Sequence, residues 1–134
     1  MKVAIFIDGK NFYSAYKECA ADRRIDFPLM ASWLVDQVGG SFLWGVYYYT
    51  GVEGPQENRP EQARLRQFLD QLEVLPGIFV YRFQRRAGTT RCPECQTRYR
   101  FTREKEVDTT MVADMLRLAA VDAFDIMVLI SGDA

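Results

Sequence analysis

The sequence predicts an α/β fold: a single domain of 134 residues with a mainly parallel sheet and one small inserted hairpin. Short apolar runs alternate along the chain with segments of helical periodicity, and strands separated by helices are typical of a parallel sheet with right-handed crossovers. Hydrophobic residues make up 49% of the chain and charged residues 26%, which is an ordinary globular balance. The length is sufficient for one buried core.

The predicted elements follow one another in a regular order. Apolar runs rich in valine, isoleucine and aromatic residues predict four strands, at Val3–Ile7, Phe42–Thr50, Ile78–Phe83 and Ile126–Ile130. Helical periods and their proline and glycine boundaries predict four helices: Asn11–Ala20, a helix from Pro28 closed by Gly39-Gly40, a helix from Pro60 ended by Pro76-Gly77, and Thr109–Val121. Gln84–Thr102 breaks this order, and its alternating residues around Cys92–Cys95 predict an inserted hairpin at about residues 84–103.

The cysteine and histidine content limits the possible catalytic mechanisms, metal ligands and cellular compartment. The chain has three cysteines and no histidine. An odd cysteine count argues against a disulfide scaffold and favours a reducing compartment, so we expect a cytoplasmic protein. Without histidine, Ser-His-Asp catalysis, Cys-His catalysis and His-ligated zinc are excluded. Proton transfer must then use carboxylates, Lys, Tyr, Cys or metal-bound water. The sequence shows no secretion signal and no apolar run of transmembrane length.

Three aspartates far apart in sequence are expected to meet at one edge of the sheet. Asp8 follows the first strand, Asp133 follows the last, and Asp108 precedes the helix that runs back between them. Ligands bind at the carboxyl ends of such strands, where the strand order reverses. Considered alone, each aspartate is more simply interpreted as an N-cap or a turn residue. Together they favour a Mg²⁺ or Mn²⁺ site that activates water for phosphodiester cleavage.

Two further polar residues accompany this cluster. Asn11 either caps the first helix or has a functional role, in which it orients Asp8 or a metal-bound water. Its occurrence next to the predicted aspartate cluster favours the functional role. Asp114 lies six residues beyond Asp108, about 9 Å along the helix and off the same face. A surface pair with Arg117 is therefore the simpler interpretation of Asp114.

Three segments of the chain resemble the motifs of a known family. The segment from Ala4 to Asn11 (AIFIDGKN) is similar to the opening FIDGxN strand of NYN domains, in the LabA/DUF88 branch of PIN-like nucleases. Lys105–Asp114 resembles the second motif, KGVD followed by an apolar helix with another Asp, and Leu129–Asp133 resembles the third, SGDxDF. The three motifs occur in the family's order and cover the chain from end to end.

The resemblance implies a three-layer PIN-like (Rossmann-like) fold and Mg²⁺- or Mn²⁺-dependent cleavage of RNA. It assigns catalytic and metal-binding roles to Asp8, Asp108 and Asp133 and a supporting catalytic role to Asn11, and it matches Asp114 to an acidic family position. In two places this sequence departs from the pattern. Glu106 replaces the usual glycine, and the third motif stops before its second Asp and its Phe, so we expect a truncated C-terminal end.

The predicted hairpin concentrates positive charge. Eight basic and two acidic residues lie between Arg82 and Lys105, so this stretch carries +6 and the rest of the chain −7. A local basic segment on a nearly neutral protein indicates a surface for a polyanion, although a solvated hairpin is an equal alternative. Tyr99 and Phe101 alternate with arginines and either stack on unpaired bases or pack against the domain. The candidate RNA-binding residues are Arg91, Arg98, Arg100, Arg103 and Lys10.

The segment Arg91–Cys95 resembles one zinc knuckle, in which Cys92 and Cys95 would supply half of the ligands. Structural zinc takes four ligands, and Cys19 lies in the first predicted helix without a local partner. Two copies of the chain in a homodimer would complete a Cys₄ site with a structural Zn²⁺ shared between them. A redox pair and a plain turn with two thiols remain alternatives.

Three functions are compatible with these features. The first is an endoribonuclease that acts on single-stranded RNA at the aspartate cluster, with no membrane association. The second is a haloacid-dehalogenase-like phosphatase with Asp8 as nucleophile, which is disfavoured because Lys10 stands where that pattern needs a second Asp. The third is a non-catalytic module that binds RNA or a protein partner, either alone or as a zinc-linked homodimer.

Overall fold

The computed structural model describes residues 1–20, 23–52, 59–84, 86–103 and 105–132. Its main sheet has four parallel strands in the order β3-β2-β1-β6. These strands are β1 (Lys2–Asp8), β2 (Phe42–Val52), β3 (Ile78–Gln84) and β6 (Ile126–Ile130). The predicted α/β class with a parallel sheet is therefore confirmed.

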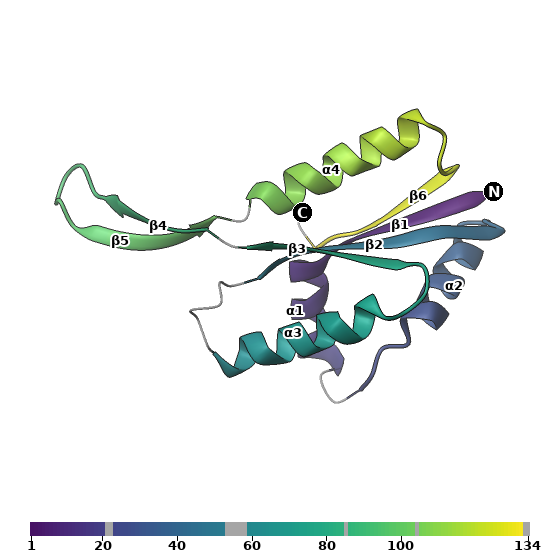
Figure 1. Ribbon diagram of the computed structural model, residues 1–134, viewed down its shortest axis with the longest axis horizontal. Coiled ribbons are helices and arrows are strands. Elements are labelled where there is room, and N and C mark those ends of the chain that lie inside the picture. The colour runs from purple at the N-terminus through teal and green to yellow at the C-terminus, as the bar shows by residue number, and fades with distance from the viewer. Residues whose placement is uncertain (21–22, 53–58, 85, 104, 133–134) are drawn as a thin grey trace.

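The helices cover the two faces of this sheet unequally. They are α1 (Gly9–Ala20), α2 (Phe27–Gln37), α3 (Pro60–Glu73) and α4 (Lys105–Ala120). Helices α1, α2 and α3 lie on one face and α4 on the other, which gives three layers (Figure 1). The chain moves from β1 to β2 to β3 in one direction and then returns to the far side of β1. Since each crossover is right-handed, this change of direction places α4 on the opposite face.

The core lies on both sides of β1. Residues Val3 to Ile7 are completely buried. Val3, Ile5 and Ile7 pack toward α1–α3, whereas Ala4 and Phe6 pack toward α4, as the alternation of side chains along a strand requires. This two-sided burial explains the continuous apolar run in the sequence.

Several element boundaries differ from those the sequence predicts. Helix α1 begins at Gly9 rather than Asn11, and α4 begins at Lys105 rather than Thr109 and ends at Ala120 rather than Val121. The first two residues of each helix carry no apolar periodicity. The sequence pattern therefore does not predict these first turns. Proline does mark helix starts correctly: Pro28 lies in the first turn of α2, whose N-cap is Asp26, and Pro60 opens α3.

A two-stranded ribbon follows β3. Strands β4 (Arg86–Arg91) and β5 (Arg98–Arg103) pair antiparallel, from Arg86 opposite Arg103 to Arg91 opposite Arg98. The ribbon projects away from the sheet, with its turn at the far end (Figure 1). Among the described helices, none is long and apolar enough to cross a membrane.

Candidate active site

The strand order reverses beside β1. Successive strands are added on the β2 side of β1, and β6 is then added on the other side. In open α/β sheets, ligands bind outside the carboxyl ends of the strands at such a reversal. Asp8 is the last residue of β1 and lies opposite Tyr49 of β2, while its neighbour Ile7 lies opposite Ile130, the last residue of β6. Asp8 therefore stands at the edge where topology favours a site.

Asp8 and Asn11 are joined directly. Only 5% of Asp8 is exposed, and the Asn11 side chain donates from Nδ2 to Asp8 Oδ2 over 2.8 Å. Asn11 is the third residue of α1, so the alternative that it caps this helix is wrong. Its side chain instead reaches back to the strand end and fixes the orientation of the carboxylate.

The chain that follows β6 passes against the same asparagine. A Cβ atom added to Gly132 would lie 3.2 Å from Asn11 Cβ and 3.4 Å from its Cγ. The segment that follows β6 is thus within contact distance of the residue that holds Asp8. Asp133 itself, the next residue, lies outside the described part of the chain.

Gly9 makes the turn from β1 into α1 tight. A Cβ atom there would lie 2.5 Å from Tyr48 Cε1, 2.7 Å from the Tyr49 carbonyl oxygen and 2.8 Å from Thr50 Cβ. The buried Tyr48 hydroxyl also donates to the Gly9 carbonyl oxygen over 3.1 Å. Burial, with the nearby Tyr13 and Asp8, raises the pKa of Tyr48, so it remains a neutral donor. The sequence revealed Gly9 only as a turn residue, and Tyr48 reads there as an ordinary core residue of β2.

Asp108 lies in the first turn of α4. It is the fourth residue of the helix and is exposed, so the alternative that it caps Thr109 is wrong. Helix α4 runs antiparallel to β6, so its first turns lie toward the carboxyl ends of the strands (Figure 1). Within residues 1–20, 23–52, 59–84, 86–103 and 105–132, no three Cys, Asp or Glu side chains are grouped closely enough to hold a metal ion.

Asp114 has structural partners on the α4 side of the sheet. Its Oδ2 accepts a hydrogen bond from the Tyr49 hydroxyl over 2.7 Å, and its Oδ1 lies 3.7 Å from an Arg117 nitrogen. Burial and this hydrogen bond both raise the pKa of Tyr49. The Arg117 contact is the surface pair that the sequence suggested. The hydrogen bond to Tyr49 joins α4 to the sheet, and no pattern in the sequence predicts it.

Comparison with known families identifies the fold. The family model described as NYN domain matches residues 2–134. The chain belongs to the NYN domain family. NYN domains are PIN-like nuclease domains, which supports a general role as an RNA nuclease. A search of curated proteins and a search of solved structures each found no significant match to the chain.

The residues of this NYN domain fit a divalent cation by their chemistry. PIN-like nucleases generally use divalent metals. Asp8 and Asp108 supply hard carboxylate oxygens, the ligands that Mg²⁺ and Mn²⁺ prefer. The burial of Asp8 and its bond to Asn11 hold one of these carboxylates in a single orientation, as a metal ligand requires.

The ribbon of the NYN domain carries part of the predicted basic surface. Arg91 and Arg98 are exposed and lie opposite each other next to the turn. The side chains of Arg100 and Arg103 are outside the described part of the structure. Lys10 lies elsewhere, in the first turn of α1 beside Asp8.

The cysteine turn at the end of the ribbon has a distinct electrostatic property. Cys95 is exposed and its thiol donates to the Thr97 hydroxyl over 3.2 Å. Hydrogen bonds from Thr97, and then from Cys92, lower the pKa of Cys95 to about 7. A thiol with this pKa is about half thiolate at neutral pH, which suits either metal binding or redox chemistry. Among the described residues, no third Cys, Asp or Glu joins this pair in a group that could hold a metal ion.

Proposed function

We propose that this NYN domain is a metal-dependent endoribonuclease that hydrolyses RNA phosphodiester bonds at a Mg²⁺ or Mn²⁺ site. The observation that carries the proposal is the buried Asp8, which ends the central strand at the point of strand-order reversal and is held by Asn11. A buried carboxylate at this position is costly for a fold unless it binds a cation or a polar partner. Both the reversal of strand order and the family favour the cation.

The proposed roles follow from the position of each residue. Asp8, Asp108 and Asp133 would bind the cation, and Asn11 keeps Asp8 in its orientation. When bound, the cation supplies activation of water and stabilisation of the charge that develops on the phosphate. This chemistry needs no histidine, in agreement with the composition of the chain.

Carboxylate-to-amide substitutions test the proposal with little change of shape. We expect Asp8→Asn and Asp108→Asn to lower Mn²⁺-dependent cleavage of a labelled single-stranded RNA by at least roughly a hundredfold, because loss of a metal ligand should exceed the 10–100-fold effect of losing its supporting partner. Asp36→Asn on the exposed surface of α2 is the matched control and should cleave normally. Circular dichroism verifies that each variant is folded. Full cleavage by folded Asp8→Asn protein would refute the proposal.

A further inference from the structure

We propose that the seam between α1 and α3 is the track along which a single RNA strand reaches Asp8. The inference rests on the proposed nuclease function and adds to it the path and the form of the substrate. It also moves the main RNA contact away from the β4–β5 ribbon that the sequence indicated.

The first part of the track is a polar hollow next to the candidate site. Its volume is about 300 Å³, and it starts at Gly9, the residue after Asp8. Among the described residues, Lys10, Lys17 and Arg59 line it, and Glu61 is the one acidic lining residue of that set. The excess of positive charge directly beside a buried carboxylate suits a phosphate chain that must approach a metal site.

A row of aromatic rings continues from this hollow along the seam. Tyr13, a lining residue of the hollow, lies 5.2 Å from Phe68 between ring centroids, and Phe68 lies 6.1 Å from Tyr16 in a stacked arrangement. All three side chains are half-buried. The Lys17 ammonium group lies 5.5 Å from the centre of the Tyr13 ring. Cations next to partly open ring faces are the combination that binds phosphates and unpaired bases together.

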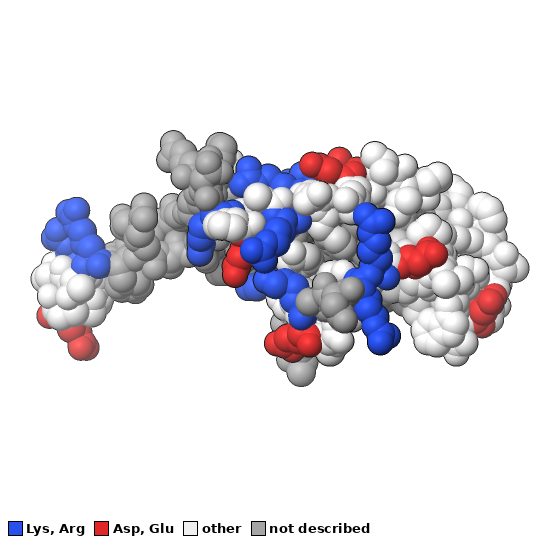
Figure 2. Space-filling model, turned by 90° about the horizontal axis from the view of Figure 1, so that it is seen from below, with Lys and Arg blue, Asp and Glu red and all other residues white. Residues whose placement is uncertain are grey.

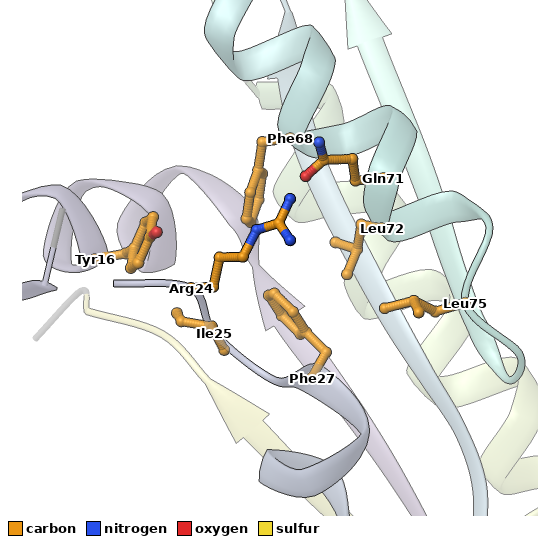
Figure 3. Close-up of a pocket in the computed structure, with 8 residues that line it drawn as sticks. All are labelled: Tyr16, Arg24, Ile25, Phe27, Phe68, Gln71, Leu72 and Leu75. Atoms are coloured by element: carbon orange, nitrogen blue, oxygen red, sulfur yellow. The ribbon is translucent and has the colours of Figure 1, made fainter. Parts of the chain in front are cut away.

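The row ends in a second hollow at the other end of α3. This hollow has a volume of about 370 Å³, and Tyr16, Phe27 and Phe68 form its aromatic walls. The Arg24 side chain extends over it toward Phe68 and Gln71 (Figure 3). Gln71 offers both a donor and an acceptor to the edge of a base. The hollow therefore combines stacking surfaces, one guanidinium group and one amide.

The two hollows lie along the same pair of helices, because α1 and α3 contribute lining residues to both. From Gln62 in the first hollow to Gln71 in the second is nine residues, about 14 Å along α3. Figure 2 shows the face formed by α1–α3, on which Lys and Arg gather between the base of the ribbon and the middle of the domain. The basic side chains and the aromatic rings thus lie along the same seam, which leads toward Asp8.

This chemistry selects an unpaired nucleic acid strand. A duplex keeps its base faces stacked inside, so it can use the cations but not the rings. An acidic peptide likewise satisfies the cations and leaves the ring faces unused. A single strand uses both, which is why it is the proposed occupant.

Removal of charge from the first hollow tests the track without touching the candidate catalytic residues. The probe is a fluorescein-labelled oligouridylate, and its binding is followed by fluorescence anisotropy in EDTA so that no cleavage occurs. We expect Lys17→Gln/Arg59→Gln to weaken binding roughly tenfold and to reduce the slope of log K against log salt by about 1.4, or 0.7 for each lost phosphate contact. Arg117→Gln, on α4 at the opposite face, is the matched control and should bind as the unmodified protein does.

The outcome that overturns the track is equally specific. If Lys17→Gln/Arg59→Gln binds as tightly as the unmodified protein, whereas Arg91→Gln/Arg98→Gln on the ribbon binds weakly, the ribbon is the RNA surface and the track is wrong. Equal or tighter binding of a duplex RNA or of polyglutamate would also overturn it. Cleavage assays separate the two proposals: absence of cleavage in Mn²⁺ by protein that still binds through the seam refutes the nuclease and not the track.

Substrate length tests the second hollow. Arg24→Gln should weaken binding of a long oligouridylate that spans both hollows and leave binding of a short one unchanged. An equal effect on both lengths, or no effect on either, would show that the strand does not extend to Phe68 and Gln71.

Discussion

Replacement of Gly9 by alanine is the sharpest test of how the fold holds the candidate site. Gly9 connects the end of β1 to the start of α1 and is buried. The added methyl group would meet Tyr48 Cε1 at 2.5 Å, the Tyr49 carbonyl oxygen at 2.7 Å and Thr50 Cβ at 2.8 Å. Tyr48 and Thr50 are at most 2% exposed, and the third atom belongs to the backbone of a paired strand. None of the three can move aside easily.

The expected loss of stability follows from these contacts. Overpacking of a buried site costs about 1–3 kcal/mol, and three contacts below 3.0 Å place Gly9→Ala at the upper end. Alanine recovers at most about 1 kcal/mol through its higher helix propensity. The net effect is a loss of about 2 kcal/mol. An unfolding entropy of about 2.1 cal/mol/K per residue gives roughly 0.28 kcal/mol/K for 134 residues, so Tm should fall by about 7 °C.

Thermal and urea unfolding followed by circular dichroism measure this change. Gly39→Ala is the control: its φ of +72° is unfavourable for alanine, but no atom lies within 4 Å of the added methyl group. It should cost about 1 kcal/mol from the backbone conformation alone. The reasoning is refuted if Gly9→Ala unfolds within about 1 °C of the unmodified protein, a shift far below the steric estimate. Since Gly9 follows Asp8, cleavage measured well below Tm should also fall.

Two other predictions follow from contacts of single side chains. Tyr49→Phe removes the donor 2.7 Å from Asp114 and should lower the free energy of unfolding by about 1–2 kcal/mol, as measured in urea; an equal loss in an Asp114→Ala background, which has no acceptor, would contradict this pairing. Alkylation of Cys95 by iodoacetamide should reach half its maximal rate near pH 7, and Thr97→Val should move this midpoint to higher pH, because the Thr97 hydrogen bonds lower the thiol pKa. A midpoint that Thr97→Val leaves in place would contradict the assigned cause.

The sheet was predictable from the sequence because its signal is strong and local. Val3–Ile7 is apolar at every position, and the structure buries this run on both faces. The N–H groups in the first turn of a helix have no partner within the helix, so proline, which has no N–H, is favoured there. Pro28 and Pro60 therefore mark helix starts. The first turns of α1 and α4 carry no such mark. Helix α1 begins at Gly9 because β1 ends just before it, and α4 begins at Lys105 because this helix packs on the sheet. Helix propensity alone does not predict either start.

The seam between α1 and α3 was not predictable in the same way. Lys17 and Arg59 are forty-two positions apart in the sequence and become neighbours of one hollow only through packing of two helices on the sheet. Phe68 reads in the sequence as one member of an apolar stripe, and its role as a link between Tyr13 and Tyr16 is a tertiary property. Charge patterning therefore favours the ribbon, where basic residues are close together in the sequence, and does not indicate the seam.

The candidate site depends partly on local sequence patterns and partly on tertiary packing. The sequence predicts the local part best. The three-residue separation of Asp8 and Asn11 works because α1 starts immediately after β1, so the asparagine side chain points back to the strand end. That contact is local, and the sequence motif encodes it fully. Asp108 depends instead on the reversal of strand order, which brings the start of α4 to the edge that Asp8 occupies. A change that shifts α4 along the sheet, such as loss of the bond between Tyr49 and Asp114, should therefore affect the role of Asp108 and leave the Asp8–Asn11 pair intact.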